Sequence, residues 1–317
     1  MSFKIVGTGS YLPPFTVTND DLSKTIDTSD EWIKQRIGIN ERRISTDEST
    51  VEMGYKAAKA ALEMSKTEAG EIDIIISASM TGDNLCPTTA GGIGQLLGIE
   101  CPAFDINSAC SGFMFALDTA AGFFARGKVK KALVVASERI SKIIDWTDRN
   151  TCVIFGDGAG AAVLEKGDGY IASYLNTCGG DDVIKIPSGT NLSPYYTKEC
   201  EKPKIFMDGQ ETFKFAVNTM TNDIKRLAED AHISLGDIKY IVPHQANVRI
   251  IQYASKRLKI PMEKFFVNIQ NYGNTSAASI AIALDELNRT KDLNDGDIIA
   301  MSAFGGGLSS GSCLVKW

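Results

Sequence analysis

Residues 103–137 read AFDINSACSGFMFALDTAAGFFARGKVKKALVVAS. A short apolar strand pattern, AFDI, leads into a turn of small residues around Cys110, and a long apolar helix pattern follows before a second strand pattern, ALVVAS. Strand, sharp turn and helix in this order are typical of α/β proteins, in which helices cover a largely parallel sheet. The stretch therefore predicts an α/β fold with Cys110 at a strand-to-helix turn.

The same order of elements recurs about 165 residues later. Residues 264–304 predict a strand, a turn rich in small residues, a helix and a strand. Residues 49–80 and 211–246 each predict a helix, a loop and an apolar strand, and each half closes on a Gly-rich hairpin, at 155–165 and 304–317. Chance similarity is the alternative, because unrelated α/β folds share the same alternation of strands and helices. The matched order of the elements favours an internal duplication.

The duplication divides the chain into residues 1–167, with Cys110, and residues 168–317, with His244 and Asn274. In α/β sheets, ligands bind beyond the carboxyl ends of the strands. Each of these three residues follows a predicted strand, and Cys110 and Asn274 occupy equivalent positions of the repeat. We therefore expect a thiol, an imidazole and a carboxamide to converge on one cleft.

Cys110 lies between Ser108-Ala109 and Ser111-Gly112, whose small side chains suit a tight turn. A cysteine at a helix N-terminus faces free N–H groups and the positive end of the helix dipole, which favour the thiolate over the thiol. The alternative is a buried structural cysteine. The turn, the repeat and the two other polar sites favour a nucleophile, and the remaining six cysteines are interpreted as structural, Cys313 in a terminal strand among them.

His244 follows an apolar strand in IVPHQAN, where we expect an imidazole exposed at the sheet edge. His232 lies near a polar helix end and is interpreted as a solvated residue. Asn274, in NYGNTSAAS, precedes a helix, so a helix cap is an alternative role that is compatible with catalysis. A neutral His and an Asn amide together can donate two hydrogen bonds to a developing enolate oxygen without abstracting a proton.

Composition narrows the classes of protein. The net charge of -6 argues against general nucleic-acid binding and would repel an acidic partner unless a local basic patch exists. The seven cysteines are odd in number and never form CxxC, which indicates reduced thiols in the cytoplasm. Two histidines exclude a His-rich metal site. No apolar run reaches the ~18 residues of a membrane span, and the start lacks a signal-peptide pattern.

The motifs together resemble the β-ketoacyl-acyl-carrier-protein synthase III family of the thiolase superfamily. The matching pieces span nearly the whole chain in family order: DEWIKQRIGINERR, CPAFDINSACSGFMFAL, FGDGAGAAVL, VPHQANVRI, NYGNTSAAS and FGGGLSSGS. The resemblance implies a five-layered αβαβα thiolase fold with two thiolase-like halves, a homodimer, and a catalytic triad carried by Cys110, His244 and Asn274.

The reaction that the resemblance implies starts fatty-acid chains in two stages. Cys110 takes the acyl group of an acyl-CoA, and malonyl-acyl-carrier protein then loses CO₂ to an enolate that attacks the acyl-cysteine. His244 and Asn274 hydrogen-bond the enolate, while backbone N–H groups of Cys110 and Gly306 hold the tetrahedral oxyanion. No cofactor is implied, because the CoA thioester is a substrate.

The resemblance also implies binding residues. Trp32 would stack on the adenine of CoA with Arg36 and Arg149 nearby; the alternative is a half-buried anchor beside two surface arginines. Gln210 stands where relatives often have Asn, which leaves that CoA contact in doubt. The carrier protein would dock on a basic helix face, for which the alternative is a solvated face, formed by Lys214, Arg249, Lys256 and Arg257.

The acyl pocket implied by the resemblance includes Phe155 and, from the partner subunit, the position of Cys86. Many relatives have a bulky aromatic residue there, so the smaller Cys86 favours a branched or longer primer; a neutral substitution in a loop is the alternative.

Two related reactions lack a residue that they need, and three other functions remain as alternatives. A degradative thiolase would need a second cysteine in the last glycine loop, where Ala303 and Phe304 stand, and a hydroxymethylglutaryl-CoA synthase would need Glu near Ala78. A condensing enzyme of a specialised pathway, a Cys-dependent thioesterase and an inactive acyl-binding protein are the remaining alternatives.

Overall fold

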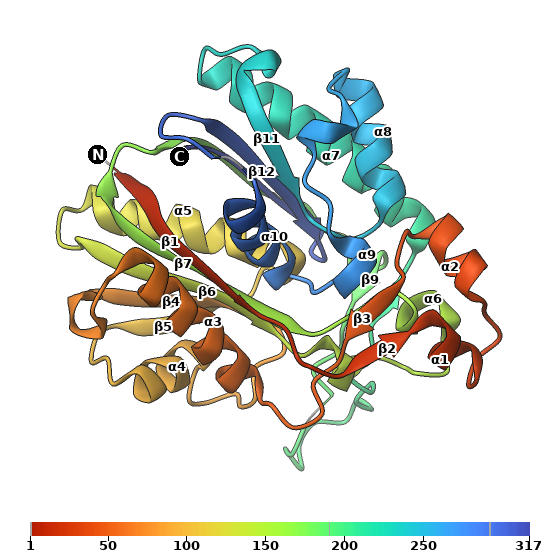
Figure 1. The fold of residues 1–317 in the computed structure, drawn as a ribbon. Coiled ribbons are helices and arrows are strands. Elements are labelled where there is room, and N and C mark those ends of the chain that lie inside the picture. The colour runs from red at the N-terminus through yellow and green to blue at the C-terminus, as the bar shows by residue number, and fades with distance from the viewer. Residues whose placement is uncertain (1, 190, 292) are drawn as a thin grey trace.

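Two β-sheets form the centre of the computed structural model, which describes residues 2–189, 191–291 and 293–317 (Figure 1). The strands of the first sheet are β1 (Ser2–Tyr11), β4 (Ile74–Ala78), β5 (Ala103–Ile106), β6 (Lys131–Glu138) and β7 (Gly158–Gly167). Those of the second are β8 (Tyr170–Thr177), β11 (Ile238–Pro243), β12 (Ile298–Gly305) and β13 (Ser309–Lys316). Each sheet thus belongs to one half of the chain.

The two sheets repeat one topology. In the first, the order is β1-β7-β6-β4-β5, and β4 runs parallel to β5 and β6, whereas β7 is antiparallel to both of its neighbours. In the second, β8-β13-β12-β11 follows the same order and the same directions. The structure therefore confirms the predicted α/β fold and the repeated order of its elements.

One predicted strand is wrong in part. Residues 264–268, the expected counterpart of β5, form only an isolated bridge between Phe265 and Ile241, supported by the hydrogen bond from Phe266 N to Ile241 O of 2.9 Å. The backbone leaves the extended conformation at Asn268 (ψ 9°), and α9 (Ile269–Tyr272) begins directly after it. The helical start leaves too little extended chain for a full strand.

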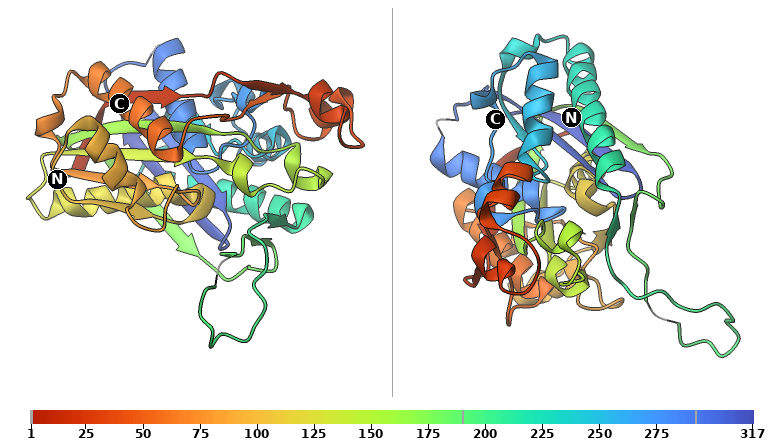
Figure 2. Two further views of the ribbon diagram at one scale, coloured as in Figure 1. Left: turned by 90° about the horizontal axis from the view of Figure 1, so that it is seen from below. Right: turned by 90° about the vertical axis from the view of Figure 1, so that its right-hand side faces the viewer.

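Helices cover every face of the sheets and complete five layers (Figures 1 and 2). The outer layer of the first sheet contains α3 (Thr50–Ser65) and α4 (Thr89–Leu97), and that of the second contains α7 (Gly209–Asp230) and α8 (Val248–Leu258). Between the sheets lie α5 (Gly112–Ala125) and α10 (Ala278–Thr290). The predicted αβαβα architecture is confirmed.

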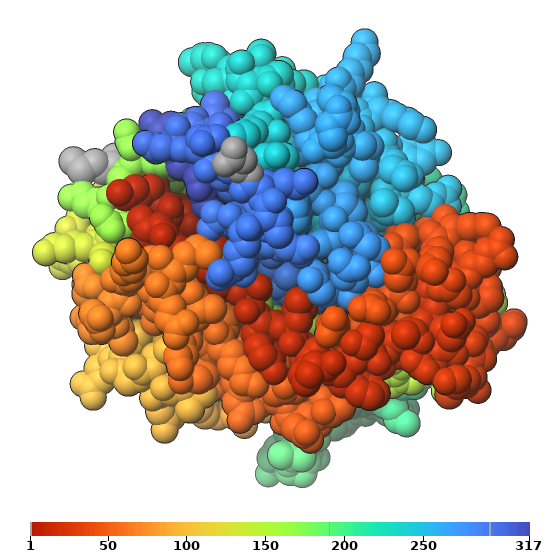
Figure 3. Space-filling view, in the orientation of Figure 1, coloured from red at the N-terminus to blue at the C-terminus, as the bar shows by residue number. Residues whose placement is uncertain are grey.

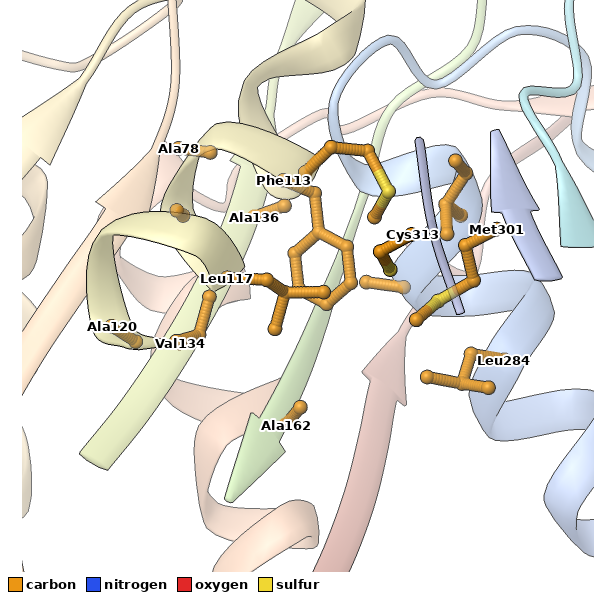
Figure 4. Close-up of a cluster of buried hydrophobic side chains, with 14 of the residues drawn as sticks. Ala78, Phe113, Leu117, Ala120, Val134, Ala136, Ala162, Leu284, Met301 and Cys313 are labelled. Atoms are coloured by element: carbon orange, nitrogen blue, oxygen red, sulfur yellow. The ribbon is translucent and has the colours of Figure 1, made fainter. Parts of the chain in front are cut away.

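Strand sequences explain this layering, because a sheet covered on both faces must be apolar on both. In β6, Leu133 and Val135 pack with α3 and α4, whereas the alternate residue Val134 packs with α5. The central cluster contains side chains of α5, such as Phe113, beside residues of both sheets (Figure 4). Burying a side chain of this size contributes about 1.5–3 kcal/mol. Cys313 is buried in this cluster, in agreement with the structural role predicted for it.

The first Gly-rich hairpin serves helix packing. A Cβ atom on Gly160 of β7 would lie 2.5 Å from the Cβ of Ala281 in α10, so only glycine lets the central helix approach the sheet this closely.

The remaining elements lie at one end of the sheets. They are β2 (Thr16–Thr18), α1 (Asn19–Ser23), α2 (Asp30–Arg36), β3 (Glu41–Arg43), α6 (Arg149–Cys152), β9 (Ile184–Lys185) and β10 (Phe206–Met207). The N-terminal segment with α1 and α2 lies along the side of the molecule next to α8 (Figure 3), and Val248 N donates to Ile37 O at 2.9 Å. The described chain between β9 and β10, residues 186–189 and 191–205, projects from the body (Figure 2). None of the described helices has the length and hydropathy that a membrane crossing requires.

Candidate active site

Cys110 lies on the predicted turn between β5 and α5. A single 3₁₀ turn, Ala109–Ser111, connects the strand to the helix, and Ala109 takes a left-handed conformation with φ of 46°. A side chain is strained in this region, and strained backbone is common at active sites. A Cβ on Gly112 would lie 3.1 Å from the Cβ of Ala78, so glycine allows the helix to start close to β4. The turn predicted from the small residues is confirmed.

Desolvation opposes the expected shift toward the thiolate, although Cys110 as a residue is only partly buried at the cavity wall. Burial raises the pKa of Cys110 to about 12, and the nearby Glu138 carboxylate acts in the same direction. Desolvation disfavours the charged form of any group, and here it outweighs the favourable position ahead of α5. The resting enzyme therefore contains a Cys110 thiol at neutral pH.

A cavity of about 760 Å³ opens over this turn and is lined by Cys110, His244 and Asn274 together. Its size is in the range of small-molecule sites. Apolar side chains form much of the remaining wall: Met80, Leu85, Ile143, Phe155, Ile184, Ile186, Ile205, Met207 and Phe304. The structure thus brings three distant turns of the sequence to one cleft.

His244 lies at the end of β11 and is only 1% exposed, so the expectation of an exposed imidazole is wrong. Its ring packs edge-on against Phe304, with ring centroids 5.1 Å apart, and Nδ1 lies 2.6 Å from Ser279 Oγ. Burial lowers the pKa of His244 to about 3, because no acidic partner compensates for its desolvation among the described residues. The imidazole is therefore neutral at physiological pH.

Ser279 is the hydrogen-bond partner of the His244 ring. Ser279 Oγ accepts a hydrogen bond from Gln245 N at 3.4 Å and keeps its own proton, which it can donate to Nδ1. With Nδ1 as the acceptor, the ring proton resides on Nε2. His244 is then a hydrogen-bond donor on the side of the ring opposite Ser279.

Asn274 is oriented in a similar way. Its Oδ1 accepts from Ser276 N at 2.8 Å, which leaves the Nδ2 amide group as a donor. Two backbone bonds hold the residue against the first half of the chain: Asn274 N donates to Ile154 O at 2.9 Å, and Gly156 N donates to Asn274 O at 3.1 Å. Ala277, rather than Asn274, is the N-cap residue of α10, so the alternative of a simple helix cap is not what the structure has.

The last glycine loop approaches the nucleophile turn closely. A Cβ on Gly305 would lie 2.8 Å from Cys110 N and 3.0 Å from its Cβ, a distance that real side chains do not tolerate. Gly306 lines the cavity next to it. Glycine at this position lets the backbone pass directly beside Cys110.

The residues predicted for CoA gather at the N-terminal segment. The guanidinium groups of Arg36 and Arg149 lie 5.7 Å and 5.1 Å from the ring centroid of Trp32, which is half-buried. Arg149 also donates to Asp27 O at 2.7 Å. Gln210 is exposed at the start of α7, where Asp208 caps its backbone N–H.

The four basic residues predicted for the carrier protein lie on α7 and α8 and are exposed: Lys214, Arg249, Lys256 and Arg257. Arg257 Nη1 donates to Asn218 Oδ1 of α7 at 2.5 Å, and Phe213 stacks edge-on against Tyr253 across the same helix pair. Lys214 lies one turn before Asn218 and forms an ion pair with Glu211 at 2.7 Å. These contacts place Arg257 and Lys214 along the α7–α8 pair, where Lys214 is partly neutralised, and Arg249 and Lys256 are exposed on the same helix α8 as Arg257.

The two residues predicted for the acyl pocket are separated. Phe155 is buried and lines the cavity. Cys86 is exposed in the loop after β4 and does not line the cavity of its own chain, whereas its neighbour Leu85 does.

Sequence reasoning missed three polar residues next to the triad. Ser279 orients His244, Ser276 donates to Cys110 Sγ at 3.4 Å, and the buried Glu138 lies 3.3 Å from Ser276 Oγ. Glu138 ends a strand at the same edge of the sheet as the other site residues, so the rule that identified the three turns would also have identified it. Among the described residues, no cluster of three or more His, Cys, Asp or Glu side chains could hold a metal ion.

Comparisons with known proteins agree with this arrangement. The family model of 3-oxoacyl-[acyl-carrier-protein] synthase III matches residues 104–180, and that of its C-terminal part matches residues 228–317. The β-ketoacyl-[acyl-carrier-protein] synthase III of Clostridium acetobutylicum is 49% identical over 100% of this chain and 99% of its own length.

Solved structures are similar over the whole fold. The 3-oxoacyl-[acyl-carrier-protein] synthase III of Aquifex aeolicus has a TM-score of 0.92 at 43% identity, covering 99% of this chain and 100% of that one. The priming β-ketosynthase of the R1128 polyketide biosynthetic pathway also has a TM-score of 0.92, at 35% identity, covering 99% and 96%.

The fold and these similarities define a condensing acyltransferase of the thiolase fold. Within that class, the chain belongs to the β-ketoacyl-acyl-carrier-protein synthase III family, as its motifs predicted.

Proposed function

We propose that this enzyme starts fatty-acid chains in the cytoplasm by condensing an acyl-CoA with malonyl-acyl-carrier protein, and that it does so as a homodimer without a cofactor. The observation that carries the proposal is the single cavity lined by the Cys110 sulfur, a neutral His244 and the Asn274 amide. Seven free cysteines are consistent with a reducing compartment.

In the first stage, the Cys110 sulfur attacks the thioester carbonyl carbon of acyl-CoA. The carbonyl oxygen becomes an oxyanion, the C–S bond to CoA breaks, and CoA leaves as a thiol that receives the proton given up by Cys110. The Cys110 and Gly306 N–H groups are the proposed oxyanion donors, since the glycine loop runs directly beside the turn. Removing one such donor typically costs ~10²–10³ in rate.

In the second stage, malonyl-acyl-carrier protein occupies the same cavity. The C–C bond to its carboxylate breaks, CO₂ leaves, and the electron pair moves into an enolate whose oxygen accepts from His244 Nε2–H and Asn274 Nδ2–H. The bond from Ser276 N fixes the donor side of Asn274, and Ser279 holds the His244 ring at Nδ1 so that Nε2 is the free nitrogen; little reorganisation is then needed as charge develops. The enolate carbon then attacks the carbonyl carbon of the acyl-cysteine, the C–S bond breaks, and the β-keto product leaves while the Cys110 thiolate takes up a proton from solvent.

For CoA, we propose that the Trp32 ring carries the adenine and that Arg36 and Arg149 contact the ring or the phosphates. Both arginines already lie against this ring, and Arg is well suited to stacking and to phosphate. For the acyl chain, we propose that Phe155 lines the pocket and that Cys86, exposed on its loop, reaches the pocket of the partner subunit.

The proposed docking site for the carrier protein is the basic surface of Lys214, Arg249, Lys256 and Arg257. An Arg249→Glu variant should raise the KM for malonyl-acyl-carrier protein about tenfold, because it places like charges opposite an acidic partner. Steady-state rates at low salt measure the effect. Lys59→Glu is the control, since this residue is exposed on α3, on the other side of the fold. An unchanged KM for the Arg249 variant would contradict docking at this surface.

The proposed reaction predicts release of CO₂ together with a β-keto product longer than the primer by two carbons. Product analysis with malonyl-acyl-carrier protein and acetyl-, isobutyryl- or octanoyl-CoA tests it, and we expect the branched or longer primers to react at least as fast as acetyl-CoA, because Cys86 is small. Free acid without CO₂ would indicate a thioesterase instead. A strong preference for acetyl-CoA would contradict the prediction that the small Cys86 admits branched or longer primers, but not the proposed reaction.

A second candidate is the priming step of a specialised pathway. The likeness to the priming β-ketosynthase of the R1128 polyketide biosynthetic pathway favours it. The same acyl-cysteine chemistry would apply, and the identity of the carrier protein that supports turnover separates the two.

A further inference from the structure

A buried carboxyl group lies behind the nucleophile and has no part in the chemistry described above. Glu138 ends β6, is fully buried, and forms no ion pair with any described residue. A charged carboxylate is costly to bury without a cation. A buried acid two hydrogen bonds away from a reactive sulfur therefore needs an explanation.

Ser276 connects this acid to the sulfur. Its Oγ lies 3.4 Å from Cys110 Sγ and 3.3 Å from Glu138 Oε1, and the residue is completely buried. Ser276 is also held in the left-handed region, with φ of 52°, by the bond from its N–H to Asn274 Oδ1. A strained non-glycine residue persists only where the surrounding structure imposes it. The strain here places a hydroxyl between the acid and the thiol.

The number of protons decides what this hydroxyl can do. Ser276 has one hydroxyl proton, so it donates either to Cys110 Sγ or to Glu138 Oε1. Ionised Glu138 attracts that proton and leaves the sulfur without a side-chain donor from Ser276. Neutral Glu138 carries a proton of its own, which it can donate to Ser276 Oγ, and the Ser276 proton then points at the sulfur.

The other contacts of Glu138 place its acid proton on the correct oxygen. Oε2 accepts from Thr81 Oγ1 and from Ser79 Oγ, the latter at 3.5 Å, and Met80 N lies 3.3 Å from both carboxyl oxygens, which share it. Thr81 Oγ1 itself accepts from Arg139 N at 2.8 Å, which leaves its own proton to donate to Glu138. Because the Thr81 and Ser79 hydroxyls approach Oε2 alone, whereas Met80 N is shared equally, the acid proton is better placed on Oε1, which faces Ser276.

We infer that Glu138 and Ser276 form a hydrogen-bonded pair that sets the reactivity of Cys110: neutral Glu138 turns the Ser276 hydroxyl toward the sulfur and stabilises its thiolate. Ser276 contacts the reacting atom, and Glu138 is a positioning residue that acts through it. The pair moves no net proton, and the inference rests on the proposed role of Cys110 as the nucleophile.

The ionisation of the surrounding groups is consistent with such a switch. Burial raises the pKa of Glu138 to about 7, so this acid changes charge near neutral pH. Cys110 faces it through Ser276. Lys142, whose Nζ donates to Thr81 O at 2.6 Å, interacts electrostatically with Glu138 and is also influenced by the charges of Arg139, Asp83 and Asp157. Because Cys110 has its pKa near 12 and His244 near 3, neither has its midpoint between pH 6 and 9.

Alkylation by iodoacetamide tests the inference on the full chain without any condensation substrate. The rate is followed from pH 6 to 9 by the mass of the peptide that contains Cys110, which separates it from the other cysteines. The decisive variant is Glu138→Gln. Its amide oxygen takes the place of Oε2 and accepts from the Thr81 and Ser79 hydroxyls. Its NH₂ group then faces Ser276 and acts as a donor at every pH, as the neutral acid does.

We expect the wild-type rate to rise with pH but to flatten in part, to a lower slope, as Glu138 ionises, whereas Glu138→Gln keeps the full slope. At pH 9 the variant should react about tenfold faster than the wild type, the size expected for one hydrogen bond to a charged group, and at pH 6 the two should agree. Ser276→Ala should react about tenfold more slowly than the wild type at pH 6 and should show no flattening.

The double variant separates a hydrogen bond from simple charge repulsion. If Ser276 transmits the effect, Glu138→Gln gains little at pH 9 in the Ser276→Ala background. An equal gain in both backgrounds, or identical profiles for the wild type and Glu138→Gln, overturns the inference. If Glu138→Gln does not fold, the profile of Ser276→Ala decides. Flattening that persists without the Ser276 hydroxyl would overturn the inference.

Two comparisons make the outcome specific. Ser255→Ala removes another buried hydroxyl, which lies on α8 and donates to Ile260 O beyond the end of that helix, and should leave the profile unchanged. Because alkylation reports only on the sulfur, loss of condensation with an intact Glu138 effect would reject the proposed function and keep this pair. Normal condensation without a Glu138 effect on alkylation would reject the Glu138–Ser276 pair and keep the proposed function.

Discussion

Replacing Cys110 by alanine is expected to abolish acyl transfer, with condensation lowered by roughly 10⁴–10⁶-fold. The reason is chemical: without the sulfur, no covalent acyl-enzyme can form, and the neighbouring serine hydroxyls are committed elsewhere. Ser111 Oγ, for example, lies 2.7 Å from both Ser108 O and Ser309 Oγ. Intact-protein mass measurement after incubation with acyl-CoA should show one acyl group on the wild type and none on Cys110→Ala.

Cys200→Ala is the matched control, because this cysteine is exposed and does not line the cavity. It should acylate and condense like the wild type. Full condensing activity in Cys110→Ala would overturn the assignment of the nucleophile. Acyl-CoA binding without any mass increase in the wild type would instead indicate an inactive acyl-binding protein.

Replacing His244 or Asn274 by alanine should separate the two stages of the reaction. Each change removes one donor to the enolate oxygen, so decarboxylative condensation should fall by about 10²–10³-fold. Acylation of Cys110 should fall much less, because the proposed donors to its tetrahedral intermediate are backbone groups. Rapid-mixing mass measurement of the acyl-enzyme gives the first rate, and CO₂ release gives the second.

His232→Ala is the control for the histidine, since this residue is exposed at the end of α7. We expect it to leave both stages unchanged. Equal losses of acylation and condensation in His244→Ala and Asn274→Ala would refute the division of roles and indicate that the pair also assists attack by the sulfur.

Much of this site could be predicted because local signals specified it. The small residues around Cys110 specified a turn, and the repeat made Asn274 its counterpart. A strand that ends at His244 placed that residue at the same edge, because parallel strands end together. The family motifs then identified the reaction class, which the comparisons confirm.

Predictions failed where a property depends on neighbours distant in sequence. Residues 264–268 have a strand-like pattern, yet pairing stops at Phe265, because α9 begins immediately afterwards. The helix N-terminus favours the Cys110 thiolate, yet burial raises the pKa of this thiol. His244, at the end of its strand, was expected to be exposed, but Phe304 and Ser279 cover its ring.

The amino-acid sequence by itself thus determined the α/β order, the duplication and the three polar turns, because periodicity and turn chemistry are short-range properties. Only the tertiary structure decided which protonation states these groups adopt and which hydroxyl lies behind the sulfur. Desolvation and hydrogen bonding depend on what packs around a group, and Ser276 lies 166 residues from Cys110 along the chain and in contact with it in space.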